Sequence, residues 1–138
     1  MRSFQTLDTV TIDDETGIIY ISKTQDDWMM PRITMRREGN YIAISASYGP
    51  MEIAMRLRFD ELVRVLSRLN AVDGLQTTRQ IGTGQAYIAL GLQQSGKIVL
   101  RPTIVADATG HLCFNLVITK SVHQQLFEWL RITPRSPQ

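Results

Sequence analysis

The sequence predicts an α+β domain, with a curved and mostly antiparallel sheet in two pseudo-repeated halves, each made of several strands followed by one amphipathic helix. Two internal similarities support this fold. The segment YIAIS at Tyr41–Ser45 recurs as YIALG at Tyr87–Gly91, and a strand that enters a helix at Met55–Phe59 matches another at Phe114–Ile118. Internal repetition constrains architecture more than any single motif does. Chance similarity between two β-rich segments is the alternative explanation.

The first expected elements are a hairpin and three further strands. Turn-forming residues at Asp13–Gly17 separate two β-branched runs, which is typical of a hairpin. Residues 24–31 break the alternating pattern and predict a loop that ends at Pro31. The three strands that follow are expected at residues 32–37, 41–48 and 51–59, with turn residues between them.

Two amphipathic helices are expected from apolar residues at helical spacing. The first lies near residues 60–69, with Asp60 as its N-cap. The second lies near residues 121–130, where Ser121 and Gln124 have the spacing of a capping box.

The second half supplies the remaining strands. A turn is expected at Asp73–Gly74, and Pro102 predicts a sheet edge or a bulge because proline has no N–H to donate. Strands are expected at residues 85–93, 97–105 and 111–119, with a short extra strand at 77–81. The single domain, residues 1–138, therefore divides into an acidic hairpin and loop at 1–31, a first strand-and-helix unit at 32–70, a second unit at 76–131 and a tail at 132–138.

Length and composition predict a globular protein without a membrane span. The chain has 138 residues, of which 43% are hydrophobic and 20% are charged, so it is long enough to bury a sizeable core. Its longest apolar runs are only a few residues, and its start lacks the apolar region of a secretory signal. The one cysteine, Cys113, cannot form an internal disulfide. A reducing compartment, the cytoplasm, is therefore expected, and a secreted protein without disulfides is the alternative.

Charge is unevenly distributed along the chain. Residues 1–31 carry two basic and six acidic side chains, whereas residues 32–138 carry thirteen basic and seven acidic ones. A mildly basic body is compatible with nucleic-acid binding. A solvated surface with chance clustering is the simpler explanation of composition alone.

Strand alternation gathers basic side chains on one face of the expected sheet. Ile53 and Leu57 share a face that must be buried, so Arg56 and Arg58 lie on the opposite face. Glu52 is the one acidic residue nearby in sequence that is expected on the same face as these arginines. Cations track phosphates, and an aromatic ring stacks on any base. A plain solvated face, or one covered by a partner, is the alternative. The expected nucleic-acid contacts are Arg32, Arg36, Tyr41, Arg56, Arg58, Tyr87, Lys97 and Arg101.

A twofold unit of strands followed by one helix, with a basic and aromatic-bearing sheet, resembles the Whirly proteins and the transcriptional positive-cofactor type of single-stranded DNA-binding domain. The resemblance extends from about Arg32 to Leu130. It implies that curved antiparallel sheets carry the nucleic acid and that the helices mediate packing or oligomerisation. Gly82–Gln85 lacks the lysine of the Whirly lysine-glycine signature, so no individual binding residue is carried over from the family.

No catalytic, cofactor or metal site is expected. Gly82, Thr83 and Gly84 lack the Lys-Ser/Thr ending of a phosphate loop and the third glycine of a dinucleotide fingerprint, so they are expected to form a turn. His111 and Cys113 share a strand face, but a zinc site requires more ligands. No nucleophile or acid-base set emerges, so the protein is expected not to be an enzyme.

The expected function is that of a non-catalytic protein that binds single-stranded DNA or RNA, in transcription or DNA maintenance, with a homo-oligomer as a further expectation. The alternative is a protein-interaction or assembly factor that docks a partner protein with its sheet face or helices. Trp28, Met29 and Trp129 are the expected partner contacts in that case. An opposing interpretation of Trp28 and Met29 is that they tuck into the core beneath the acidic segment.

Overall fold

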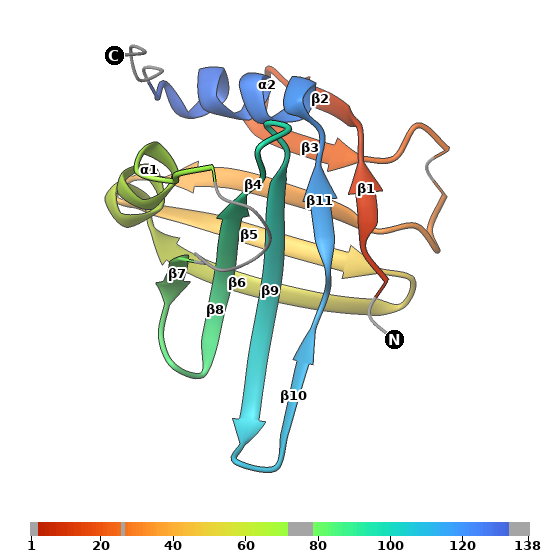
Figure 1. Cartoon of the computed structure of the whole chain (residues 1–138). Helices are drawn as coiled ribbons and strands as arrows, with labels where there is room; N and C mark the ends of the chain where they lie inside the picture. The colour runs from red at the N-terminus through yellow and green to blue at the C-terminus, as the bar shows by residue number, and fades with distance from the viewer. Residues whose placement is uncertain (1–2, 26, 72–78, 133–138) are drawn as a thin grey trace.

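The protein folds into two β-sheets that enclose one core, with two helices at the margins of the sheets (Figure 1). The computed structural model describes residues 3–25, 27–71 and 79–132, and this part of the chain contains eleven strands and two helices. The α+β class and the mostly antiparallel pairing are confirmed. The expectation of one curved sheet is wrong, because the strands divide between two separate sheets.

The first sheet is a five-stranded antiparallel meander whose strands follow one another in chain order. The expected hairpin around Asp13–Gly17 and the three strands after it are confirmed to within a residue or two. Phe59 belongs to the following helix, not to the third of these strands. The strands are β2 (Thr9–Asp13), β3 (Ile18–Ser22), β4 (Arg32–Glu38), β5 (Tyr41–Tyr48) and β6 (Met51–Arg58).

The second sheet contains the remaining strands in the order β1-β11-β9-β8-β7, with β10 paired to β9. The short β1 was not expected, and it pairs in parallel with β11. The expected extra strand is present as β7, whereas Thr77, Thr78 and the turn at Asp73–Gly74 lie outside the described residues. The strands are β1 (Gln5–Leu7), β7 (Arg79–Gly82), β8 (Ala86–Leu92), β9 (Ile98–Asp107), β10 (Gly110–Cys113) and β11 (Leu116–Ile118).

The strand expected at 111–119 is divided into β10 and β11 at Phe114 and Asn115. Pro102 lies in β9, between the part of this strand that pairs with β11 and the part that pairs with β10. The Pro102 carbonyl accepts a hydrogen bond from the Phe114 N–H at 3.1 Å. A proline offers no N–H to a ladder, so an irregular position in the neighbouring strand accommodates it.

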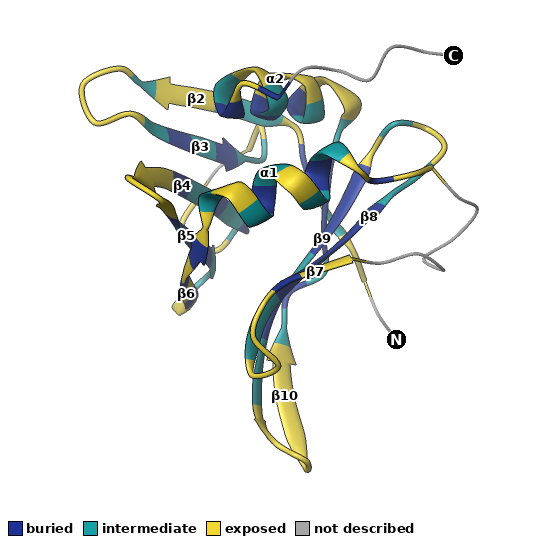
Figure 2. Cartoon of the chain, turned by 90° about the vertical axis from the view of Figure 1, so that its left-hand side faces the viewer, coloured by how far each residue is buried: buried dark blue, intermediate teal, exposed yellow. Residues whose placement is uncertain are grey.

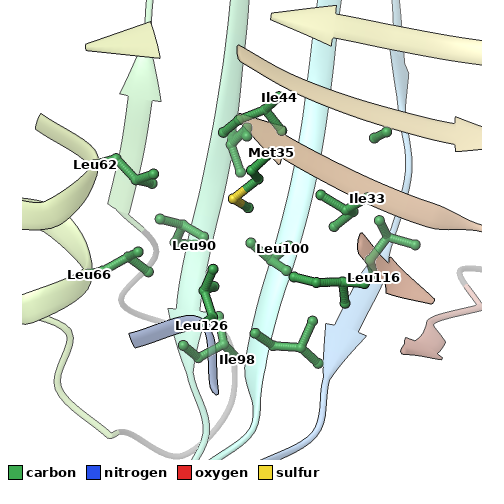
Figure 3. Packing of buried hydrophobic residues seen from close by; sticks show 14 of the residues in the cluster. Ile33, Met35, Ile44, Leu62, Leu66, Leu90, Ile98, Leu100, Leu116 and Leu126 are labelled. Atoms are coloured by element: carbon green, nitrogen blue, oxygen red, sulfur yellow. The ribbon is translucent and has the colours of Figure 1, made fainter. Parts of the chain in front are cut away.

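The core lies between the inner faces of the two sheets. Ile33, Met35 and Ile44 from the first sheet meet Leu90 and Leu100 from the second, and all five are buried (Figure 3). Burying one such side chain stabilises the fold by roughly 1.5–3 kcal/mol. The alternation of buried and exposed residues along β4, β5 and β6 therefore follows directly from this packing.

Helix α1 (Phe59–Ser67) follows β6 without a connecting loop. The Phe59 N–H donates to the Asn40 carbonyl at 2.9 Å, and the Arg37 guanidinium lies 3.8 Å from the centre of the Phe59 ring. The expectation that Asp60 caps this helix is wrong: the N-cap is Arg58, which makes no side-chain cap. Asp60 lies inside the first turn, since apolar Phe59 already packs against the core and starts the helix one residue earlier.

Helix α2 (Lys120–Leu130) is capped by Thr119, not by Ser121 as expected. The Thr119 hydroxyl accepts a hydrogen bond from the Val122 N–H at 3.2 Å. Ser121 Oγ instead accepts from the Gln125 amide within the helix. Strand β11 ends at Ile118, and Thr119 keeps an extended backbone, as N-cap residues typically do, before the helix begins at Lys120.

The two helices close the margins of the sheets. Helix α1 contacts β5, β6 and β7, and it thus bridges the edge strand of the first sheet and the edge strand of the second. Helix α2 contacts β2, at the opposite edge of the first sheet. Within the described residues, neither helix has the length and hydrophobicity needed to cross a membrane.

The cap of α2 provides a test of this local structure. We expect Thr119→Ala to lower the free energy of unfolding by about 1 kcal/mol, because the Val122 N–H loses its acceptor. The matched variant Ser121→Ala removes a hydroxyl two residues later and should change stability by no more than about 0.5 kcal/mol. Urea unfolding followed by circular dichroism measures both, and a larger loss for Ser121→Ala would contradict the observed cap.

Candidate functional site

The outer face of the first sheet carries five of the predicted contact residues. We call this surface the arginine face, and it consists of Arg32, Arg36, Tyr41, Arg56 and Arg58. Their neighbours in sequence, such as Ile33, Met35 and Leu57, are buried on the inner face. The cross-strand register aligns Arg36, Ala43 and Arg56 in one row, and Glu38, Tyr41 and Arg58 in the next.

Tyr41 lies at the end of this basic surface where β4 turns into β5, opposite Glu38. Its side chain is 41% exposed, and the Arg56 guanidinium lies 4.6 Å from the centre of its ring. Arg58 is its direct neighbour across β5 and β6. A guanidinium above a tyrosine ring is a cation–π contact, which holds the cation beside the aromatic surface at a modest energy for an exposed site.

Acidic partners are more numerous on this face than the sequence indicated. The Arg56 Nε lies 3.6 Å from Glu38 Oε1, and the Arg58 Nε lies 3.6 Å from Asp60 Oδ1. Glu52 accepts a hydrogen bond from the Ser45 hydroxyl at 2.6 Å. These ion pairs are solvent-exposed, so each contributes at most about 1 kcal/mol and can exchange for another anion. The short β4–β5 turn brings Glu38 opposite Tyr41, a register that strand alternation alone does not reveal.

The other three predicted contacts do not join the arginine face. Tyr87 and Arg101 lie on the outer face of the second sheet, which points away from the arginine face because the inner faces of both sheets meet at the core. Lys97 is exposed in the turn between β8 and β9. On the same outer face, Ala89 and Val99 are buried, so this face is not an open surface like that of the first sheet.

Arg101 is held by local contacts. Its Nε donates to Asn115 Oδ1 at 2.8 Å, and its guanidinium lies 5.9 Å from the centre of the Phe4 ring. One terminal nitrogen, Nη2, is buried without a hydrogen-bond partner in the described part of the chain. This arrangement ties the start of the chain to the segment between β10 and β11, which is a structural role.

The predicted partner contacts separate into an exposed pair and a half-buried residue. Trp28 is 67% exposed and Met29 is 48% exposed, so the interpretation that they tuck into the core is wrong. Gly49, at the β5–β6 turn, lies directly beside the Met29 thioether. Trp129 instead packs against the core from α2 and is half-buried. Trp28 and Met29 are therefore the accessible residues of the three.

The turn expected at Gly82–Gly84 is present between β7 and β8, although Gly82 itself is the last residue of β7. The Thr83 hydroxyl accepts hydrogen bonds from the N–H groups of Gln85 and Ala86. Gly82 has φ +124°, and a Cβ at this position would lie 2.4 Å from the Ala86 carbonyl oxygen. The glycine is thus required by the backbone of the hairpin.

Titratable groups with shifted pKa values lie away from the arginine face. Hydrogen bonds from the Thr24 side chain lower the pKa of the Asp8 carboxyl, and hydrogen bonds from Thr109 lower the pKa of Asp107. His111 and Cys113 lie on β10, opposite Val105 and Thr103. Over residues 3–25, 27–71 and 79–132 there is no group of three or more His, Cys, Asp or Glu side chains suited to a metal ion.

An apolar groove of about 520 Å³ lies between the two helices and the β8–β9 turn. The His123 Nδ1 is 2.9 Å from the Gly96 carbonyl oxygen, and its ring meets the Phe127 ring edge-on at 4.3 Å. None of the predicted contact residues lines this groove. Sequence patterns did not reveal it, because its walls come from separate elements. The apolar residues that line it include Leu66, Leu69, Leu92, Ile98, Phe127 and Ile132.

Substitution of the two turn glycines tests the structural role of this segment. We expect Gly82→Ala to destabilise the protein by about 1–3 kcal/mol, since alanine must adopt a strained φ against the Ala86 carbonyl. Gly84 has open space at its Cβ position, so Gly84→Ala should change stability by less than about 0.5 kcal/mol. Thermal unfolding of both variants measures the difference, and equal stabilities would refute it.

The surface thus offers an exposed basic face around Tyr41, an exposed apolar pair at Trp28 and Met29, and an apolar groove beside the helices. No protein-family model, curated protein or solved structure matches this chain.

Proposed function

We propose that this protein binds single-stranded nucleic acid without catalysis, through the arginine face. The observation that carries the proposal is the exposed Tyr41 ring with the Arg56 guanidinium 4.6 Å from its centre and with Arg58 beside it. An aromatic ring accepts any base by stacking, and adjacent cations neutralise the phosphates on either side. The combination favours binding that depends little on base sequence.

The positions of the arginines on β4 support a binding path for a nucleic-acid strand along the sheet. Arg32 is at the first residue of the strand, near the end of the sheet that carries the Trp28 loop, and Arg36 lies four residues further on. The seven residues of β4 span roughly 20 Å at the usual rise of a strand. Tyr41 lies opposite Glu38, the last residue of β4, so the ring and Arg32 are at opposite ends of this strand. A nucleic-acid strand laid along β4 would pass Arg32 and Arg36 before it reaches the Tyr41 ring.

The ion pairs on the face are compatible with this function. Glu38 and Asp60 are exposed and lie 3.6 Å from their arginines. Each pair therefore separates at little cost when a phosphate replaces the carboxylate. The carboxylates also reduce the net charge of the free surface, so binding by this face is expected to be moderate in strength and sensitive to salt.

We also propose that the two strand-and-helix units derive from one ancestral unit of the type found in Whirly proteins. The direct passage from β6 into α1 and the short passage from β11 into α2 support this interpretation, since they are the two segments that match at Met55–Phe59 and Phe114–Ile118. The unequal outer faces of the two sheets indicate that only the first unit would have kept an open basic surface.

A second candidate function is the docking of a partner protein. It is favoured by the high exposure of Trp28 at 67% and Met29 at 48%, next to the β5–β6 turn where Met51 is also exposed. Large apolar side chains at the surface are typical anchors of protein interfaces. In this case the arginine face would meet acidic side chains of the partner.

Salt dependence tests the role of the arginines. We expect the affinity for a labelled single-stranded oligonucleotide to fall as salt rises, and Arg36→Ala to reduce the slope of log K against log salt by about 0.7. Lys97→Ala removes the same charge from an exposed turn outside the arginine face and should leave the slope unchanged. Fluorescence anisotropy with DNA, RNA and duplex at several salt concentrations measures this. A slope that Arg36→Ala does not alter would refute the role of the face.

Substitution of Tyr41 tests base stacking. Loss of one base–aromatic contact costs about 1–3 kcal/mol, so Tyr41→Ala should weaken oligonucleotide binding roughly 5–150-fold. Tyr41→Phe keeps the ring and should bind almost as well as the wild type. Normal oligonucleotide binding by Tyr41→Ala would contradict the nucleic-acid function. If Trp28→Ala also abolishes capture of a stoichiometric protein partner, the docking function is the correct one.

A further inference from the structure

A second basic surface lies between α1 and β7, apart from the arginine face. It is a hollow of about 520 Å³. We call it the α1–β7 hollow. Strand and helix periodicity does not reveal this hollow, because its two walls come from segments that are separate in the sequence. The described residues that line it are Arg64, Val65, Arg68, Arg79 and Gln80.

The fold brings these arginines together from two elements. Leu62 and Leu66 anchor α1 in the core, which leaves Arg64 and Arg68 exposed and one helical turn apart. Arg79 shares its face of β7 with the buried Ile81, and this face looks toward α1. Helix α1 contacts β7, and Figures 1 and 2 both show the two elements side by side.

The charge of the hollow is not neutralised by the described residues. Arg56 and Arg58 on the arginine face each have a carboxylate partner, whereas Arg64, Arg68 and Arg79 form no ion pair within residues 3–25, 27–71 and 79–132. The C-terminal end of α1 contributes roughly half a negative charge. That is small beside three guanidinium charges, so the hollow attracts anions.

The lining indicates which anion fits. Guanidinium groups bind phosphate through two parallel N–H donors, a geometry that a point charge such as ammonium does not provide. Gln80 adds an amide donor, and Val65 adds a short apolar contact. The described lining has no aromatic ring to stack on a base and no nucleophile or acid-base pair. The hollow therefore suits phosphate groups themselves, and it suits binding in preference to reaction.

We propose that the α1–β7 hollow is a phosphate-binding site in which Arg64, Arg68 and Arg79 contact one phosphate group or two linked ones. The phosphates belong either to a small polyphosphate compound or to the backbone of a nucleic-acid strand, since both present the same oxygen atoms. This proposal does not depend on the arginine face. It requires only that the three guanidinium groups remain accessible, as they are in the structure.

Isothermal titration calorimetry with inorganic pyrophosphate at low salt tests the site. The hollow variant carries Arg64→Gln, Arg68→Gln and Arg79→Gln, and the matched face variant carries Arg36→Gln, Arg56→Gln and Arg58→Gln, so both lose three positive charges. We expect the hollow variant to bind pyrophosphate at least about tenfold more weakly. The face variant should remain within about twofold of wild type, since distant sites act independently. Circular dichroism and thermal unfolding confirm that both variants fold.

Two outcomes would overturn the proposal: wild-type protein that does not bind pyrophosphate, or an equal loss of affinity in both variants. A labelled single-stranded oligonucleotide then identifies the source of the phosphates. Weaker oligonucleotide binding by the hollow variant assigns the site to a nucleic-acid strand, and unchanged binding assigns it to a small polyphosphate. If no oligonucleotide binds but pyrophosphate binding still requires the hollow, the function of the arginine face fails and the phosphate site stands.

Discussion

Apolar packing between the inner faces of the two sheets is the constraint on which the rest of the structure depends. Side chains alternate along a strand, so the burial of Ile33 and Met35 forces Arg36 to the outside. A register slip of one residue would turn Arg56 toward the core, where an unpaired guanidinium is very costly. The arginine face is therefore held in place by the residues behind it, and its own exposed contacts contribute little to its position.

The same core produces two different outer surfaces. On the first sheet the outer side chains include the exposed Arg36, Arg56 and Arg58, whereas on the second sheet Val99 and Val117 are buried on the outer side as well. The second sheet thus holds Tyr87 and Arg101 in a more enclosed setting. Within the described residues the two sheets are thus chemically unequal, and the first presents the more exposed outer surface.

Sequence patterns predict well those strands and helices whose positions depend on neighbouring residues in the chain. The strands expected at 41–48 and 51–59 follow from alternation and from the turn residues between them, and they agree with the structure to within one residue. The parallel strand Gln5–Leu7 is too short for a periodic pattern and depends on pairing with a segment more than a hundred residues away. The α2 cap at Thr119 depends on where β11 ends. The α1–β7 hollow needs Arg79 to meet a helix from another part of the chain, and only tertiary structure places it there.

The passage from Arg58 to Phe59, without a loop, has a consequence for how the two basic surfaces act together. The arginine face ends at the residue before α1 begins, and the Phe59 N–H is fixed to the Asn40 carbonyl. The first sheet and α1 are thus joined without a loop, and this junction sets the separation between the arginine face and the Arg64–Arg68 wall of the hollow. A polyanion too short to bridge that separation gains nothing from the second surface. If both surfaces bind phosphate as proposed, a polyanion long enough to bridge them gains avidity, because its second contact forms at a high effective concentration.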